Sequence, residues 1–430
     1  MLFQLNSTKI QYIEIIMKSF EKLGIDEDFG PYFVEEGITT PTEVQKKVIP
    51  KLIKRQSTIC LAQTGTGKTL AYALPISEMV KTIEDEQGLS QKKSKPFAII
   101  VVPTKELAVQ IHQVFKDISH HVKLRVRTVV GGHKGKQTAS LSGQSYEILI
   151  ATPTRLAKAI KNKEVSTEQL NYLVFDEADN LFEMGFRKDV ETILFPVNYV
   201  DTDIHFFSAT MPADVEDFLQ EKFAKKKLVK LELESAHRVQ QRVETFNIFV
   251  SPKEKKQMLK MFLERTAKGR GIVFINQKNQ VKEVEEFIQE NMPKLKYKVL
   301  HGELSQKERL ANHKAFMNKK AQVLFATDIA ARGIDVKDIA WVFNYGLPRT
   351  PIYYLHRCGR TGRAGNTGAV YNLVTHFDSK LIGVINNSIK KQDNIDIELI
   401  AKDISEVKKK KAPKKKIKTK RVKITKRTKR

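Results

Sequence analysis

The chain has 430 residues, of which 41% are hydrophobic and 29% are charged, and its formal net charge is +26 at pH 7. This length exceeds one ordinary hydrophobic core and indicates two domains, and the composition is typical of a globular protein. A membrane-spanning protein is excluded, because the longest apolar runs, such as FAIIVV at 97–102, fall far short of the roughly 18 residues that cross a bilayer.

The N-terminus and the cysteines predict an intracellular protein. Residues 1–20 lack the basic start, the continuous apolar stretch and the small-residue cleavage site of an export signal. Cys60 and Cys358 are too far apart in sequence to form a disulfide framework or a metal site by themselves, which agrees with a reducing compartment. We expect a cytoplasmic location, or a nucleolar or mitochondrial one in a eukaryote.

Short apolar runs that end in small or polar residues alternate with helical stretches in the first half of the chain. An amphipathic helix is predicted over 105–122. This alternation predicts a doubly wound α/β domain with a parallel sheet over residues 38–230, and residues 1–37 are expected to pack ahead of it as helices. The predicted strands lie in 58–63, 97–103, 146–153, 172–179 and 204–210.

The same pattern restarts in the second half and predicts a second α/β domain over residues 244–400. The polar segment 231–243 has no strong apolar period and is the predicted flexible linker. The predicted strands of this half lie in 271–277, 297–304, 321–328, 341–348 and 368–374.

The positive charge is concentrated in a C-terminal tail, residues 401–430. Residues 408–430 hold fifteen Lys or Arg and no acid. A segment with so few large apolar residues is expected to be disordered until it meets a polyanion. A solubilising or targeting tail is the alternative. The positive balance of the remaining chain favours a nucleic-acid partner.

AQTGTGKT at 62–69 follows a predicted strand, precedes a predicted helix and fits the pattern GxxxxGK[ST]. Glycines at 65 and 67 let backbone amides point at phosphate oxygens, Lys68 reaches the β and γ phosphates, and the Thr69 hydroxyl can bind Mg²⁺. The loop residues expected to contact a nucleoside triphosphate are Thr64, Gly65, Thr66, Gly67, Lys68 and Thr69.

LVFDEADNLFEMGF at 173–186 leads from a buried strand into three acids. The acids could cap the next helix. The phosphate loop favours a second interpretation, in which Asp176 anchors the Mg²⁺ and Glu177 takes a proton from the attacking water. Asp179 is then expected to contact the second domain.

With these motifs the sequence resembles the DEAD-box RNA helicases of helicase superfamily 2, over roughly residues 20–375. The resemblance implies two tandem RecA-like domains, ATP with Mg²⁺, and a monomer that binds RNA largely without sequence preference. The further matching motifs are GITTPTEVQ at 37, PTKELA at 103, Gly131 and Gly132, TPTRL at 152, SAT at 208, VFIN at 273, HGELSQKER at 301, ATDIAARGID at 326 and HRCGRTGR at 356.

The resemblance implies an adenine pocket in which Gln45 reads the base edge, because a glutamine amide can donate and accept at once. Phe20 would support this pocket, and Asp335 would contact the ribose. This chain has Ile38 where the family commonly has an aromatic residue, so stacking on the base should be weaker.

Arg360 and Arg363 resemble the family's arginine fingers, which the second domain brings to the γ phosphate. His356 is expected to link ATP to RNA contacts, with a structural histidine as the alternative. Ser208 and Thr210 resemble the motif that couples hydrolysis to strand separation.

The implied RNA-binding residues are small, hydroxyl or basic and suit contacts to phosphate and sugar. Lys105 stands where the family usually has Arg, which loses a bidentate fork, and Thr154 stands where it usually has Gly and is expected to cap a helix. The set is Thr104, Lys105, Gly132, Thr152, Arg155, Thr327 and Arg332.

The sequence therefore predicts an ATP-dependent RNA helicase whose two domains close around ATP and RNA, unwind short duplexes locally and release RNA after hydrolysis. Ribosome assembly or messenger turnover is the expected setting, with the basic tail attracting RNA or ribosomal particles. Two alternatives are a catalytically weak RNA-binding scaffold and a DNA-directed translocase of the same superfamily.

Deleting residues 408–430 should weaken RNA binding and flatten its salt dependence, because fewer counterions are released from the phosphates. ATP turnover at saturating RNA should persist. Binding titrations at several salt concentrations measure both effects, and a full-length variant with Gln in place of the tail's Lys and Arg serves as the length-matched control. An unchanged salt slope would contradict this role of the tail.

Overall fold

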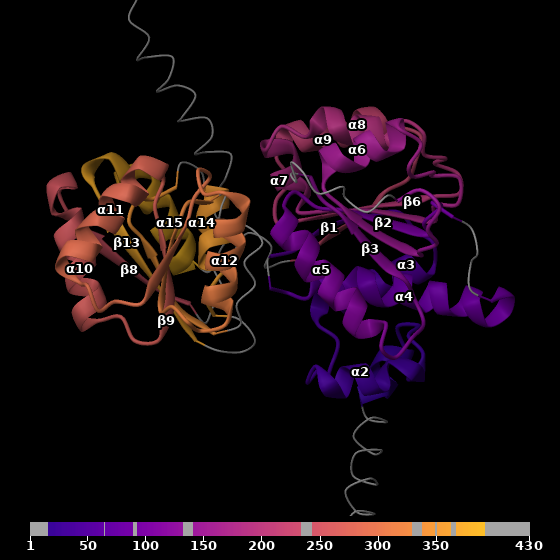
Figure 1. The fold of residues 1–430 in the computed structure, drawn as a ribbon, viewed down its shortest axis with the longest axis horizontal. Coiled ribbons are helices and arrows are strands. Elements are labelled where there is room, and N and C mark those ends of the chain that lie inside the picture. The colour runs from indigo at the N-terminus through magenta and orange to yellow at the C-terminus, as the bar shows by residue number, and fades with distance from the viewer. Residues whose placement is uncertain are drawn as a thin grey trace, which may run out of the picture.

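The computed structural model describes residues 16–63, 65–88, 93–131, 141–233, 243–328, 338–348, 351–362 and 367–391. Their strands form two separate sheets, each with helices on both faces (Figure 1), and every strand pairs with its neighbours in parallel. The predicted fold class, two doubly wound α/β units, is confirmed. No helix of these described segments is long and apolar enough to cross a membrane.

The first sheet has seven strands in the order β3-β4-β2-β5-β6-β1-β7. β1, β5 and β6 lie side by side near its centre, so their carboxyl ends meet at one edge, where α/β sheets bind ligands. The strands are β1 (Thr58–Leu61), β2 (Ala98–Val101), β3 (Val126–Val129), β4 (Ile148–Ala151), β5 (Tyr172–Asp176), β6 (Asp203–Ser208) and β7 (Val229–Glu232).

Two helical layers bury the faces of this sheet (Figure 1). One face packs against α3 (Glu43–Ile53), α4 (Lys68–Gln87) and α5 (Lys105–Ile118). Helical residues 16–21, η1 (Glu27–Phe29) and α2 (Gly30–Glu35) add to this layer, and residues 1–15 of the predicted N-terminal helical segment lie outside the described residues. The other face packs against α6 (Pro153–Lys161), α7 (Ala178–Glu183), α8 (Arg187–Leu194) and α9 (Ala213–Lys222).

The second sheet has six strands in the order β10-β11-β9-β12-β13-β8. α10 (Lys255–Arg265) and α11 (Lys278–Asn291) cover one face, and α12 (Gln306–Met317), α14 (Pro351–Cys358) and α15 (Ser379–Lys391) cover the other. The strands and short helices are β8 (Val243–Phe249), η2 (Pro252–Glu254), β9 (Arg270–Phe274), β10 (Tyr297–Leu300), β11 (Val323–Ala326), β12 (Ile339–Asn344), β13 (Gly368–Val374) and η3 (His376–Asp378).

All ten predicted strands are present, and β3, β7 and β8 are strands that the sequence analysis did not name. These three lie at sheet edges and are only partly buried, so they lack the continuous apolar run of a central parallel strand. The predicted linker, 231–243, starts inside β7 and ends on the first residue of β8. Residues 234–242 and the basic tail, 401–430, lie outside the described residues. The domain limits stay a prediction.

Gly271 in β9 should be required for the packing of the second sheet. A Cβ at this position would lie 2.1 Å from Cδ2 of Trp341, so Gly271→Ala should lower the free energy of unfolding by about 1–3 kcal/mol through overpacking. Urea denaturation measures the change. Gly383→Ala in α15 is the control, since a Cβ there meets no atom within 4 Å and alanine favours a helix. Equal effects of the two substitutions would contradict this account.

Candidate nucleotide site and interdomain groove

The loop between β1 and α4 has the backbone that a phosphate site requires. Gly65 and Gly67 adopt φ values of +80° and +93°, in the left-handed region that favours glycine. α4 starts at Lys68 without a side-chain cap, so its first amides are available to an anion. Lys68 is buried, and its Nζ donates to the carbonyl oxygen of Ala62 at 2.8 Å. Thr64 lies outside the described residues.

Gln45 joins the start of α3 to this loop. Its Oε1 accepts from the Thr42 amide at 2.9 Å, and its Nε2 donates to the Gly67 carbonyl at 3.3 Å. A Cβ on Gly67 would lie 2.6 Å from that Nε2, so this close approach also requires glycine. The predicted base reader is therefore placed beside the phosphate loop. Phe20 is fully buried and stacks on Phe33 with ring centroids 4.1 Å apart, in the core that also contains α3.

Asp176 ends β5 and is buried opposite Lys68. Its Oδ2 accepts from the Tyr72 hydroxyl at 2.9 Å, and Tyr72 also interacts with Thr69, so one hydroxyl links the two predicted metal ligands. Burial raises the pKa of Asp176 to about 6, which Lys68 partly offsets and the neighbouring Glu177 carboxylate reinforces.

Glu177 adopts φ +51°, ψ +50°, a left-handed conformation that is uncommon for a residue other than glycine. Its side chain makes no capping bond to α7 and instead accepts from Asn180 Nδ2 at 3.0 Å. Strained backbone of this kind tends to occur at functional sites. The geometry therefore does not favour the alternative in which Glu177 serves as a helix cap.

Asp179 connects four groups. Its amide donates to Ser208 Oγ at 3.1 Å, and its Oδ2 accepts from the Thr210 amide at 3.1 Å and the Thr210 hydroxyl at 2.8 Å. His356 Nε2, from α14 of the second sheet, lies 3.6 Å from the same oxygen. Burial alone would raise the pKa of Asp179, but His356 and the Thr210 hydroxyl hold it well below its usual range. The four residues predicted to have coupling roles thus meet at Asp179: Thr210 and His356 at its carboxylate, and Ser208 at its amide.

Arg360 follows α14 and is 7% exposed, but Arg363 and Asp335 lie outside the described residues. The sequence analysis did not single out Arg357, which is 1% exposed and pairs with both oxygens of Asp328, at 2.6 and 2.7 Å. Arg357 lies between two predicted site residues, His356 and Arg360, in HRCGRTGR, and this position could have identified it.

A groove of about 540 Å³ lies between the two sheets and collects several predicted RNA-binding residues. Thr104 caps α5, Thr152 precedes α6, and Arg155 pairs with Glu164 at 2.6 Å. Gly132 and Arg332 lie outside the described residues, and Thr327, which follows β11, is not among the described residues that line the groove. The lining consists of Pro103, Thr104, Lys105, Glu106, Gly131, Thr152, Thr154, Arg155, Lys158, Met184, Phe186, Leu304 and Arg309.

Thr154 corrects one expectation, because it does not cap α6. Thr152 is the N-cap residue, and the Thr154 hydroxyl donates to Asp189 Oδ2 at 2.6 Å. Pro153 occupies the first helical position, which shifts Thr154 into the helix.

Two further contacts join the halves of the protein beside the groove, and sequence reasoning missed both. Arg309 Nε of α12 lies 3.0 Å from Glu106 Oε1 of α5, and the Tyr353 hydroxyl of α14 donates to Glu183 at the end of α7. Arg309 lies in the motif HGELSQKER, so the resemblance carried a signal for it. Neither partner of the Tyr353 contact lies in a motif position with a predicted role.

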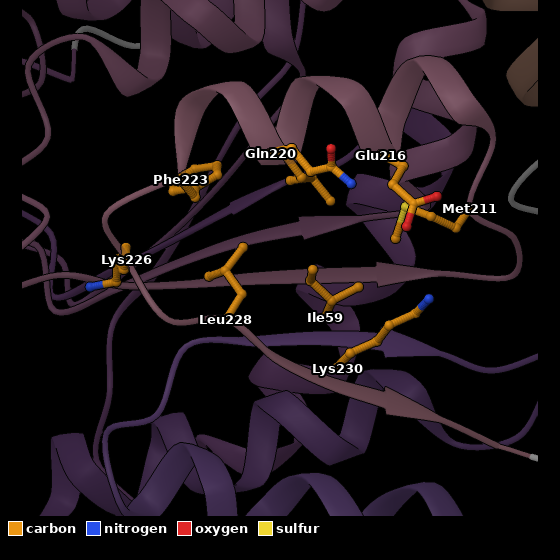
Figure 2. A pocket seen from close by; sticks show the side chains of 9 residues that line it. Ile59, Met211, Glu216, Gln220, Phe223, Lys226, Leu228 and Lys230 are labelled. Atoms are coloured by element: carbon orange, nitrogen blue, oxygen red, sulfur yellow. The ribbon is translucent and has the colours of Figure 1, made fainter.

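A second hollow, of about 190 Å³, lies over the edge strand β7 and contains none of the predicted site residues (Figure 2). Ile59, Leu219 and Leu228 form much of its apolar wall. Lys226 at its rim is already bonded to the carbonyl oxygens of Tyr199 and Thr202.

Two family models match the chain: the DEAD/DEAH box helicase model over residues 42–218 and the helicase conserved C-terminal domain model over residues 254–365. DEAD-box ATP-dependent RNA helicase RhpA of Helicobacter pylori (strain B128) is 33% identical over 384 residues, which cover 89% of this chain and 73% of the relative. ATP-dependent rRNA helicase RRP3 of Ajellomyces capsulatus (strain NAm1 / WU24) is 33% identical over 398 residues, 91% of this chain and 79% of the relative.

Among solved structures, S. cerevisiae Dbp5 bound to RNA and ADP BeF3 has the same fold, with a TM-score of 0.73 and 24% identity over 87% of this chain and 93% of that chain. Two RecA-like sheets, a phosphate loop on the first and a helix of the second that reaches the acids beside it, define a two-domain P-loop nucleotide-binding protein. The chain belongs to the DEAD-box family of ATP-dependent RNA helicases.

Asp176→Asn should change how stability depends on pH in the absence of metal and nucleotide. The folded state of the wild type holds the Asp176 proton up to about pH 6, whereas the unfolded state releases it near pH 4. Because the folded state then binds more protons, this group makes the wild type lose stability as pH rises from 4 to 6. Asparagine does not titrate, so the variant should not show this loss of stability. Denaturation curves at half-unit pH steps measure the free energy of unfolding of both proteins. A difference in free energy between the wild type and the variant that stays constant from pH 4 to 6 would contradict the prediction.

Proposed function

We propose that this helicase holds one ATP in the first unit and completes the catalytic site with residues of the second unit when RNA occupies the interdomain groove. The observation that carries the proposal is the contact between Asp179 and His356. It supports closure, because it brings α14, and with it the segment of Arg360, to the acids beside the phosphate loop.

In this proposal Gln45 and Phe20 belong to the adenine pocket, and the loop from Thr64 to Thr69 binds the phosphates. Lys68 supports this role, because its ammonium group is buried and donates to the Ala62 carbonyl, an interaction that a phosphate oxygen can replace. Asp335 would contact the ribose, as the resemblance implies.

We propose that Thr69 and Asp176 hold the Mg²⁺ that accompanies ATP. The donor set fits, since a hydroxyl and a carboxylate are oxygen ligands of the kind Mg²⁺ selects, and the Tyr72 hydroxyl interacts with both side chains. When bound, the ion would neutralise charge on the β and γ phosphates.

Glu177 is the proposed general base. Its side chain makes no capping bond to α7, and Asn180 Nδ2 donates to its carboxylate. Arg360 and Arg363 are the proposed arginine fingers, which would spread the negative charge of the transition state. Turnover therefore requires both units at one γ phosphate.

RNA is proposed to lie in the groove, where backbone amides, hydroxyls and Lys105, Arg155, Lys158 and Arg309 suit phosphate and sugar contacts. Lys105 is half-buried in this groove and desolvation lowers its pKa, which favours a site that an anion completes. Gly132, Thr327 and Arg332 are proposed to extend this surface.

We further propose a cytoplasmic monomer that acts on ribosome precursors or messenger RNA. Cys60 and Cys358 are both free and buried, which agrees with a reducing compartment.

Glu177→Gln tests the proposal most directly. Loss of the base should lower RNA-stimulated ATP turnover by about 10²–10⁴-fold, while ATP and RNA still bind and form a long-lived ternary complex. Steady-state turnover and a nucleotide-dependent RNA-binding assay measure both effects.

Glu168→Gln, on an exposed loop, is the matched control and should be neutral. Single-stranded RNA and DNA of equal length should be compared in each assay. Substantial hydrolysis by Glu177→Gln would remove Glu177 from its role, equal stimulation by DNA would favour the translocase, and stimulation by neither would favour a scaffold.

A further inference from the structure

Three asparagines form a row on the face of the second sheet that α14 and α15 cover. Asn344 of β12, Asn372 of β13 and Asn247 of β8 are register partners across adjacent parallel strands. Asn344 Nδ2 donates to Asn372 Oδ1 at 2.8 Å, and Asn372 Nδ2 donates to Asn247 Oδ1 at 2.8 Å. Asn344 and Asn372 are fully buried among the apolar residues of this face. We call the three residues the asparagine ladder.

One end of the ladder is the buried guanidinium of Arg357. An arginine has five N–H donors, and all five are bonded. Nε and one NH2 proton donate to Asp328, the other NH2 proton donates to Asn276 Oδ1 at 2.8 Å, and NH1 donates to Asn344 Oδ1 at 2.9 Å and to the Gly346 carbonyl at 2.7 Å. A guanidinium group with all five donors bonded is held in one position and one orientation.

The other end is α15. Asn247 Nδ2 donates to Asn386 Oδ1 at 2.9 Å, and Asn372 Nδ2 also donates to the Tyr354 hydroxyl of α14 at 3.1 Å. Arginine can only donate, so Asn344 must present its oxygen to Arg357 and its nitrogen to Asn372. The same reasoning sets every amide along the ladder, which therefore has one direction from α14 to α15.

The opposite face of the sheet fixes the same register. Each ladder asparagine follows an aromatic residue, and these three, Phe343, Tyr371 and Phe246, are themselves register partners. The rings of Phe246 and Tyr371 stack at 4.9 Å, and Phe262 of α10 packs against Tyr371 and Phe343 at 4.6 and 4.5 Å. A one-residue slip of a strand would move its asparagine onto the face covered by α10 and its aromatic residue onto the face covered by α14 and α15.

We propose that the asparagine ladder is a positioning element for the ATPase reaction, with Asn372 as its central residue. This inference rests on the proposed function, because it acts through α14, where Arg357 stands between His356 and Arg360. Apolar packing is non-directional and would tolerate small shifts of the helix, whereas a buried polar chain with every donor satisfied specifies one placement. A shift of about 1 Å in a catalytic group can lower turnover by about 10²-fold.

Asn372→Leu replaces the central amide by an apolar group of similar size. RNA-stimulated kcat should fall by about tenfold, since α14 then lacks its fixed placement. KM for ATP and nucleotide affinity without RNA should stay within about twofold, because Gln45 and the phosphate loop belong to the other sheet.

Ile288→Ala is the matched control for loss of stability. Ile288 of α11 is fully buried against the opposite face of the same sheet and lies in a different core cluster from α14. Both variants are compared at a temperature where each remains folded by circular dichroism. Ile288→Ala should keep kcat within about twofold of the wild type.

The second readout is the double variant with His356→Ala. If the ladder acts through α14, Asn372→Leu should lower kcat by less than about twofold in the His356→Ala background, where the cross-sheet contact is already lost. A purely structural effect would give the same tenfold loss in both backgrounds and would overturn the inference.

Asn386→Ala keeps the inference testable if Asn372→Leu fails to fold, because it removes only the final bond, at the partly exposed end of the network. It should lower kcat by about two- to threefold with KM unchanged. A kcat equal to the wild type in the folded variant would overturn the inference. Absence of RNA-stimulated turnover in the wild type would instead overturn the proposed function.

Discussion

The arrangement of the two units depends on the contacts that the buried carboxylate of Asp179 makes. A carboxylate in a low-dielectric interior is costly unless donors satisfy it, and here the donors come from two different sheets. Thr210 of the first sheet supplies two hydrogen bonds, and His356 of the second approaches the same oxygen. Separation of the units would leave that carboxylate with fewer partners.

The topology of the first sheet explains why Asp179 can serve this role. β5 and β6 are neighbours in register, with Asp176 opposite Phe207, so the chain segments that follow them leave the sheet at the same level. This places Ser208 and Thr210 next to the residues after β5. β1, on the other side of β6, brings the phosphate loop to the same edge. One edge therefore presents both the candidate nucleotide site and the contact to the second unit.

The central strands and the phosphate loop could be predicted because their signals are local. A strand buried on both faces is a continuous apolar run, and a phosphate loop has its glycines and lysine within eight residues. The edge strands β3, β7 and β8 lacked that signal, because one side of each meets solvent.

The contacts of Glu106 with Arg309 and of Glu183 with Tyr353 could not be predicted, since they depend on how the two sheets face each other. The asparagine ladder was hidden for a similar reason: an isolated asparagine in an apolar run resembles a local irregularity until the strand register aligns three of them.

The two units use buried polar groups in opposite ways, and this difference bears on how closure works. In the first unit, polar groups at the sheet edge keep bonding capacity: the amides at the start of α4 are uncapped, and burial raises the pKa of Asp176, which Lys68 only partly offsets. In the second unit, Arg357 has no unused donor and the ladder continues its bonds to α15. Ligand binding can therefore change the first site without rearranging the second. Because the donors of Arg357 are already satisfied, α14 is placed before the units meet, so the free energy of ATP and RNA binding is available to form the contacts between the units, at Asp179, Glu106 and Glu183, rather than to reorganise α14.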